Sequence, residues 1–297
     1  MSVISDYKSA PFDVFTQPVG TSNYTGTATT PTPGFTPTSV SYGGGTIYDT
    51  SYDMLCGVRF NTNDGRQVIM VRNGATEIAA VAISSGYLVQ APAEITTWNN
   101  LAITVPTATP ATAGTYQVLV TNAGTKLNVN EYANGYLIVS AGTGIGQTLQ
   151  IASHQAAVAT TGKFIVTLQD PIQVTLDATS TVTLVRNPYI GVVVAATGLT
   201  GTAVGASFYV IAAGTASTYD GTSGALTTPG QPVYAFVGCH GVWGVLQDSS
   251  TAAVGLPVSA STTTAGCATV FTAAKQYIGN MAGSGTSAKI APVDLKL

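Results

Sequence analysis

Two histidines and three cysteines are the side chains of this 297-residue sequence best suited to hold a metal ion. Cys239 and His240 are adjacent, whereas Cys267, Cys56 and His154 lie far from them in the sequence. Adjacent residues of a strand point to opposite faces, so Cys239 and His240 cannot easily share a metal. Structural zinc also takes four ligands, usually in close pairs. We therefore expect no metal site, and we interpret the cysteines as small apolar core residues.

The segment Gly142-Thr143-Gly144-Ile145-Gly146 has the glycine content of a phosphate-binding loop. Such loops lead into a helix, whose N-terminal backbone N–H groups bind the phosphate. Here Gln147-Thr148-Leu149-Gln150-Ile151 follows, and this segment reads as a strand. The pattern therefore favours a hairpin connection, and we expect no cofactor.

The acidic residues, ten Asp and three Glu, form no catalytic pattern. Asp64, Asp170 and Asp220 precede Gly or Pro, where a short polar side chain stabilises a turn. Glu77 and the other two glutamates share no motif. The sequence has no Gly-x-Ser-x-Gly elbow and no Ser or Cys near a His in a nucleophile context. We therefore predict a protein that is not an enzyme. An enzyme built from residues distant in sequence is the third class that we considered.

Charged residues make up 8% of the chain and give a net charge of −3. An ordinary soluble protein has about a quarter. This composition excludes a polybasic nucleic-acid surface. Residues 1–8 lack the basic and apolar regions of a secretory signal, and no apolar stretch reaches the length of a membrane span. The odd, widely spaced cysteines indicate folding in a reducing cytoplasm with free thiols. We expect no direct contact with nucleic acid or membrane.

The periodicity of the chain after Cys56 is two, which is typical of strands. Residues 116–121, 163–169 and 181–184 alternate clearly, and no window of 12 residues has a capped amphipathic helical pattern. Only residues 270–278 could hold a short helix. Asn-Gly and Asp-Gly pairs predict hairpin turns; they are Asp64-Gly65, Asn73-Gly74 and Asn134-Gly135. Residues 57–83 then read as successive antiparallel strands. We expect an all-β fold of antiparallel β-sandwich or barrel domains with very little helix.

Three parts are expected: an extended arm at 1–55, a β-sandwich or barrel domain at 56–190, and a second β-domain at 191–297. Residues 214–230 read as a long surface insertion in the last of these. The arm is rich in Pro, Gly and Thr, so it favours extended chain, yet it carries many aromatic residues. It either lies on another protein or caps its own domain. In the first case the contact residues are Tyr7, Phe12, Phe15, Tyr24, Phe35, Tyr42 and Tyr48.

Several segments occur in an order that resembles the head decoration (cement) proteins of tailed bacteriophages. They include Gly86-Tyr87-Leu88-Val89-Gln90, Tyr132-Ala133-Asn134-Gly135-Tyr136-Leu137, Leu168-Gln169-Asp170-Pro171, Asn187-Pro188-Tyr189-Ile190-Gly191-Val192-Val193 and Val254-Gly255-Leu256-Pro257-Val258. The resemblance spans about residues 57–297 and leaves out the arm. The chain departs from the pattern at Gln155, where proline is expected after the His.

The resemblance implies a virion structural protein on the capsid surface, assembled in the host cytoplasm. Its partners would be the major capsid protein, whose subunits it bridges, and neighbouring copies of itself. A homo-oligomer is expected, with a trimer favoured by the symmetry of shells. The alternative is a tail, fibre or head-fibre receptor-binding protein. Such proteins tend to show repeats or long shafts, and this chain shows neither.

Overall fold

The structure is a computed structural model. It describes residues 39–42, 45–48, 53, 55–78, 85–93, 96–105, 111–158, 162–215, 217–228, 230–271, 275–286 and 289–297, the first two of these ranges as backbone only. The described residues form strands joined by turns, with one short 3-10 helix, η4 (Thr96–Trp98). The predicted all-β class is confirmed. Among these residues no helix is both long and apolar enough to span a bilayer.

The chain forms two compact units, and one is inserted into the other. Unit 1 comprises residues 1–93, 188–216 and 230–297, and unit 2 comprises residues 94–187 and 217–229. The expected boundary near residue 190 agrees with the return to unit 1 at Pro188. The expected division into domains 56–190 and 191–297 is wrong in two places, however. Residues 56–93 belong with the C-terminal part, and residues 217–229 belong with unit 2.

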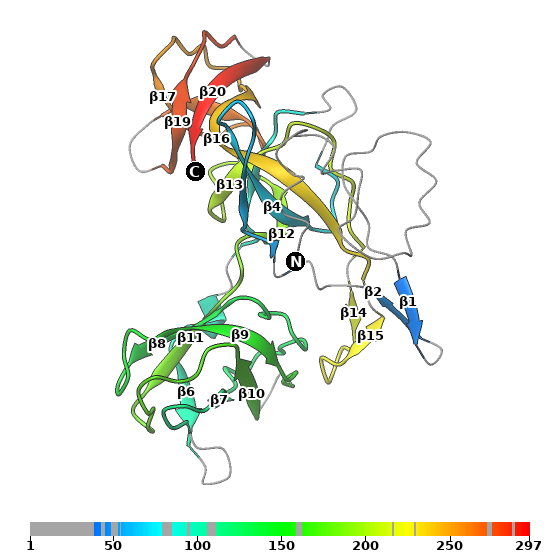
Figure 1. Ribbon diagram of the computed structural model, residues 1–297, viewed down its shortest axis with the longest axis vertical. Coiled ribbons are helices and arrows are strands. Elements are labelled where there is room, and N and C mark those ends of the chain that lie inside the picture. Colours follow the sequence, from blue (N-terminus) through cyan, green and yellow to red (C-terminus); the bar gives the residue numbers. More distant parts are fainter. Residues whose placement is uncertain are drawn as a thin grey trace. The chain divides into compact units, whose positions relative to one another are not determined.

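Unit 2 is a closed barrel of six strands, in the order β10-β7-β6-β11-β8-β9 (Figure 1). The strands are β6 (Leu101–Thr104), β7 (Gln117–Thr121), β8 (Tyr136–Ala141), β9 (Thr148–His154), β10 (Lys163–Leu168) and β11 (Thr181–Val185). β7, β10 and β11 confirm three of the strands expected from alternation. Their inward residues are buried, and Val118, Phe164 and Leu184 are at most 1% exposed. Trp98 and Tyr132 complete this core.

A small hairpin in the second segment of unit 2, residues 217–229, also belongs to this unit. It consists of β14 (Thr218–Tyr219) and β15 (Leu226–Thr228), which lie in the expected 214–230 insertion. Val129 N donates a hydrogen bond of 3.0 Å to the carbonyl oxygen of Gly224 in its turn. The insertion is therefore attached to the barrel unit by backbone contacts.

Unit 1 contains a ten-stranded sheet, with the order β18-β17-β19-β20-β16-β13-β5-β12-β4-β3. Its strands are β3 (Arg59–Asn61), β4 (Gln67–Asn73), β5 (Leu88–Gln90), β12 (Ile190–Val194), β13 (Ala203–Ala206), β16 (Val233–Leu246), β17 (Pro257–Ala260), β18 (Ala268–Val270), β19 (Tyr277–Met281) and β20 (Ile290–Lys296). β4 also pairs with β16, so β16-β13-β5-β12-β4 form a closed ring. The pair β12–β4 is parallel, which the antiparallel expectation did not include.

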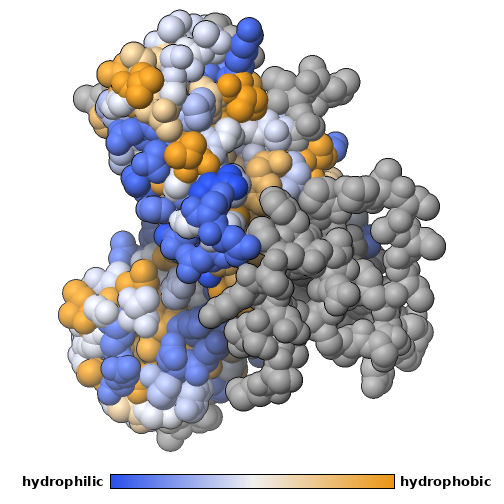
Figure 2. Space-filling model, turned by 45° about the horizontal axis from the view of Figure 1, so that its top comes forward, coloured by the Kyte–Doolittle hydropathy of each residue, from blue (hydrophilic) through white to orange (hydrophobic). Residues whose placement is uncertain are grey.

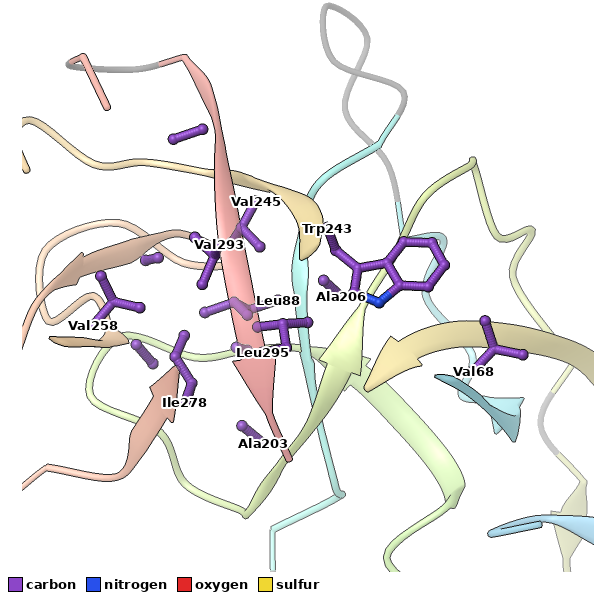
Figure 3. Close-up of a cluster of buried hydrophobic side chains, with 14 of the residues drawn as sticks. Val68, Leu88, Ala203, Ala206, Trp243, Val245, Val258, Ile278, Val293 and Leu295 are labelled. Atoms are coloured by element: carbon purple, nitrogen blue, oxygen red, sulfur yellow. The ribbon is translucent and has the colours of Figure 1, made fainter. Parts of the chain in front are cut away.

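β16 is the central strand of unit 1, because its 14 residues pair with β4 and then with β20, and Gly238 also pairs with Ala206 of β13. Residues from Val233 to His240 pair with β4, and residues from His240 to Leu246 pair with β20. The register with β4 shifts between Gly238 and His240, and His240 pairs with both β4 and β20. Apolar side chains of both halves fill the core. Leu88, Val245, Val293 and Leu295 gather beside β20 (Figure 3).

Two of the three predicted hairpin turns differ from the structure. Asp64-Gly65 joins β3 to β4 as expected. Asn73 instead ends β4 with a buried side chain that donates to the carbonyl oxygens of Thr76 and Ala212, at 2.9 and 2.7 Å. Asn134 has a φ of 60° and lies in the turn before β8 rather than between paired strands. Of the residues expected to allow a helix, those at both ends lie in β18 and β19, and 272–274 lie outside the described residues.

Candidate interaction surface

The aromatic residues expected to contact a partner lie mostly outside the described part of the chain. Tyr7, Phe12, Phe15, Tyr24 and Phe35 fall outside the described residues. The backbones of Tyr42 and Tyr48 lie in a hairpin of β1 (Ser39–Tyr42) and β2 (Gly45–Tyr48). This part of the candidate site therefore stays a prediction.

The expected arm ends earlier than residue 55, because Asp53 belongs to the core of unit 1. Its carboxylate accepts hydrogen bonds from Arg72 Nη1 at 2.5 Å and from the Tyr234 hydroxyl at 2.8 Å. Asp53 is 6% exposed. Burial raises the pKa of Asp53, and the Arg72 guanidinium opposes that rise. The contacts tie the end of the N-terminal segment to β4 and β16. No local pattern in the sequence indicated this ion pair.

Unit 1 exposes a group of apolar and small residues on β16 and β20, which we call the outer apolar face; its members are Val242, Gly244, Ile290 and Pro292. Val242 and Ile290 are 46% and 45% exposed. Gly244 lies directly opposite Pro292, and a Cβ atom at Gly244 would come within 2.8 Å of Ile290 Cγ2. Gly244, Ile290 and Pro292 are therefore contiguous, and Val242 lies two residues before Gly244 on the same strand, opposite Asp294.

The residues between them point inward. Trp243, Val245, Ala291 and Val293 are buried in the core of unit 1. An antiparallel sheet with one face in water usually carries polar residues on that face. The outer apolar face departs from this rule, and the segments 242–246 and 290–293 contain no charged or hydroxyl residue. These two continuous apolar runs are the sequence signal for the face. They do not alternate in polarity, so the strand pattern of period two does not reveal them.

Exposed apolar residues also occur on unit 2, at the end of the barrel formed by the β8–β9 turn. Ile145 and Val174 are 66% and 50% exposed. Gln147 joins the two segments that carry them, since its Nε2 donates to the carbonyl oxygens of Gly144 and Val174, and its Oε1 accepts from Val174 N. Figure 2 shows hydrophobic residues interspersed with hydrophilic ones on the visible face of the described residues.

The glycine-rich segment 142–146 is the connection between β8 and β9, as predicted. Gly142 has a φ of +77°, and Gly144 has one of +79°. Thr143 Oγ1 donates to Asp177 Oδ2 at 2.6 Å. Hydrogen bonds from Thr143 and then Thr179 lower the pKa of Asp177 to about 2. The segment is thus held by side chains of the neighbouring turn, and it leads into a strand.

Both nitrogen atoms of the buried His154 ring are engaged within unit 2. Nε2 accepts a hydrogen bond from Tyr132 N at 2.9 Å, and Nδ1 lies 2.9 Å from the carbonyl oxygen of Gln155. A carbonyl can only accept, so Nδ1 carries the proton and the ring is neutral. Burial lowers the pKa of His154, which the Gln155 carbonyl and Glu131 partly oppose. This histidine has a structural role in the core.

The cysteines and the acidic turns follow the expected structural interpretation. Cys56, Cys239 and Cys267 are buried and free. Burial raises the pKa of the Cys267 thiol to about 11. Within the described residues no three His, Cys, Asp or Glu side chains are grouped so that they could hold a metal. Asp220 accepts from the backbone N–H groups of Thr222 and Ser223, as a turn residue does.

Comparisons with protein-family models, curated proteins and solved structures gave no match to this chain. The case for a function therefore depends on the physical character of the chain and on the resemblance in segment order.

Proposed function

We propose that this chain is a non-enzymatic structural protein of a tailed-bacteriophage virion. In this role it decorates the capsid and cements it by bridging major capsid subunits. The proposal includes contacts with neighbouring copies in a homo-oligomer, for which a trimer is the simplest symmetric choice. The chain would be assembled in the host cytoplasm and would act on the capsid surface.

The observation that carries the proposal is a firmly hydrogen-bonded β-scaffold that exposes apolar side chains in a chain with few charges. Unit 1 exposes the outer apolar face, and unit 2 exposes Ile145 and Val174 on segments joined by Gln147. The chain has only 10 Lys and Arg and 13 Asp and Glu. Such surfaces bind through apolar contact and neutral hydrogen bonds. Scaffolds whose side chains are already fixed lose little entropy on binding.

Binding to the assembled shell, and not to dispersed subunits, would stabilise the shell by mass action. The decisive experiment is to prepare particles with and without the protein and to follow genome release on heating. Particles that lack it should release their genome at a lower temperature, and added protein should restore them. Because salt screens mainly exposed charge pairs, restoration should be similar at low and high salt.

The number of copies per particle separates this function from its alternative. A cement protein should be present in hundreds of copies, comparable with the major capsid protein. A tail, fibre or head-fibre protein should be present in a few to a few tens. If particles without the protein are equally heat-stable but no longer adsorb to cells, the receptor-binding alternative replaces the proposal.

A further inference from the structure

Val242 and Ile290 of the outer apolar face stay 46% and 45% exposed within the described part of unit 1, although Gly86 lies beside Ile290 and Gly283 lies beside Pro292. β20 pairs with β16 on one side and with β19 on the other. An added strand therefore has no free edge of β20 to join, so a partner on this face would bind through side chains. The charged residues that follow on β20 also leave the face neutral, because Lys296 Nζ pairs with Asp294 Oδ2 at 2.9 Å.

We propose that the N-terminal residues 1–38 of a second copy of this chain bind the outer apolar face. This inference rests on the proposed function, since it names the contact by which neighbouring copies are joined. The first argument is chemical. Residues 1–38 contain five aromatic residues but only three charged ones, Asp6, Lys8 and Asp13. An aromatic-rich segment with so few charges matches a face of Val, Ile, Pro and Gly.

The second argument is the length of this segment and the place where it joins unit 1. Thirty-eight extended residues span up to about 125 Å at 3.3 Å each, well beyond the size of one unit. The chain is anchored at Asp53, which binds Arg72 and Tyr234 on the β4-paired half of β16. The outer apolar face lies on the other half of β16. A segment fixed at its C-terminal end could then link two copies by reaching from its own anchor to the neighbour's face.

Photo-crosslinking in the full-length protein tests this contact directly. A benzophenone amino acid replaces Phe12 or Phe15, and the experiment mixes isotopically heavy and light chains at equal amounts. The expected result is a crosslink between a heavy and a light chain, mapped to the peptides that contain Val242 or Ile290 and Pro292. Crosslinks confined to single chains, crosslinks to other peptides, or none would each overturn the inference.

Substitutions provide the second arm of the test, with sedimentation equilibrium as the measurement. V242K should weaken self-association about tenfold, because it places a charge where an apolar side chain would be buried. F15S should do the same from the other side of the contact. L226K is the matched control, since Leu226 lies in unit 2, is 46% exposed like Val242, and should change the affinity less than twofold. Equal effects of V242K and L226K would overturn the inference, and circular dichroism checks that each variant folds.

The two proposals fail in distinguishable ways. If V242K abolishes the crosslink while the wild-type protein protects particles against heat, both proposals are supported. If the wild-type protein protects particles but no crosslink between a heavy and a light chain reaches the peptides of the outer apolar face, only the self-contact is wrong. If particles do not carry the wild-type protein in hundreds of copies, the proposed function is wrong. This holds even where the crosslink between copies forms.

Discussion

Mild acid should destabilise unit 2 through His154. The ring is 3% exposed, and it packs against Tyr132 and Phe164 with ring centroids 6.2 Å away in each case. A proton added to Nε2 would face the Tyr132 N–H group, which now donates to that atom at 2.9 Å. The protonated ring would lose this hydrogen bond and place a charge in an apolar core.

The sign and size of the effect follow from the lowered pKa. An unfolded histidine titrates near 6.5, and burial lowers the pKa of His154 in the folded state. Above pH 6.5 neither state binds the proton, so stability does not change on this account. Below pH 6.5 the unfolded state binds it first, and the free energy of unfolding falls by about 1.4 kcal/mol per pH unit until the folded pKa is reached.

The substitution H154Q isolates this contribution. At pH 8 the variant should be less stable by about 2 kcal/mol, because Tyr132 N–H loses its acceptor and the aromatic contacts are lost. Since glutamine does not titrate, the difference from wild type should shrink as the pH falls from 6.5 to 5. H240Q changes the histidine of unit 1 and serves as the control, since it should leave the unfolding of unit 2 unchanged.

Urea unfolding followed by Trp98 fluorescence is the appropriate measurement. Trp98 lies in unit 2, 6.4 Å from the Tyr132 ring and 6.1 Å from the Phe164 ring. The other tryptophan, Trp243, lies in unit 1, so a W243F background makes the signal specific for unit 2. If the H154Q difference is the same at pH 5 and pH 8, the assignment of His154 as a buried neutral histidine is wrong.

Three further predictions concern the stability of the two units. D53A should destabilise unit 1 by about 2 kcal/mol in denaturant unfolding, less than the loss of a fully buried pair, because the Arg72 side chain is 28% exposed; a D64A control at an exposed turn should cost far less. G142A should lower the stability of unit 2 by more than G146A, because both glycines have positive φ but only the Cβ at residue 142 would clash with the carbonyl oxygen of Thr179; equal losses would contradict the clash. Replacing Cys56, Cys239 and Cys267 together by Ala should cost about 1–3 kcal/mol through lost packing without preventing folding; bound zinc in the wild type, or a mass change on reduction, would contradict this interpretation.

The sequence was sufficient to predict local structure where the pattern of a strand lies entirely within that strand. Residues 163–168 alternate in polarity, and β10 has the matching pattern of exposed and buried residues. The glycines at 142–146 led to the correct hairpin because a strand pattern followed them. The same logic misled at Asn73-Gly74, where the dipeptide ends a strand and the Asn side chain binds distant backbone. A dipeptide that favours a turn does not specify which strands pair on either side of it.

The insertion of unit 2 could not be predicted from local patterns. β4 pairs with β16, although Val71 and Ala235 are far apart in the sequence and unit 2 lies between them. Such pairing depends on how the side chains of two distant strands pack together. The periodicity of one segment contains no information about its partner. The Asp53 ion pair was missed for a related reason, since one carboxylate among aromatic residues gives no indication of a partner at Arg72 or Tyr234.

The interrupted course of the chain also determines how it carries mechanical load. Asp53 and Leu297, toward the two ends of the described chain, both belong to unit 1, and unit 2 is inserted between parts of unit 1. Tension applied between the ends therefore passes through the strand pairs of unit 1. There β16 is hydrogen-bonded first to β4 and then to β20, so many bonds in a row resist shear. Unit 2 therefore carries no load until unit 1 opens.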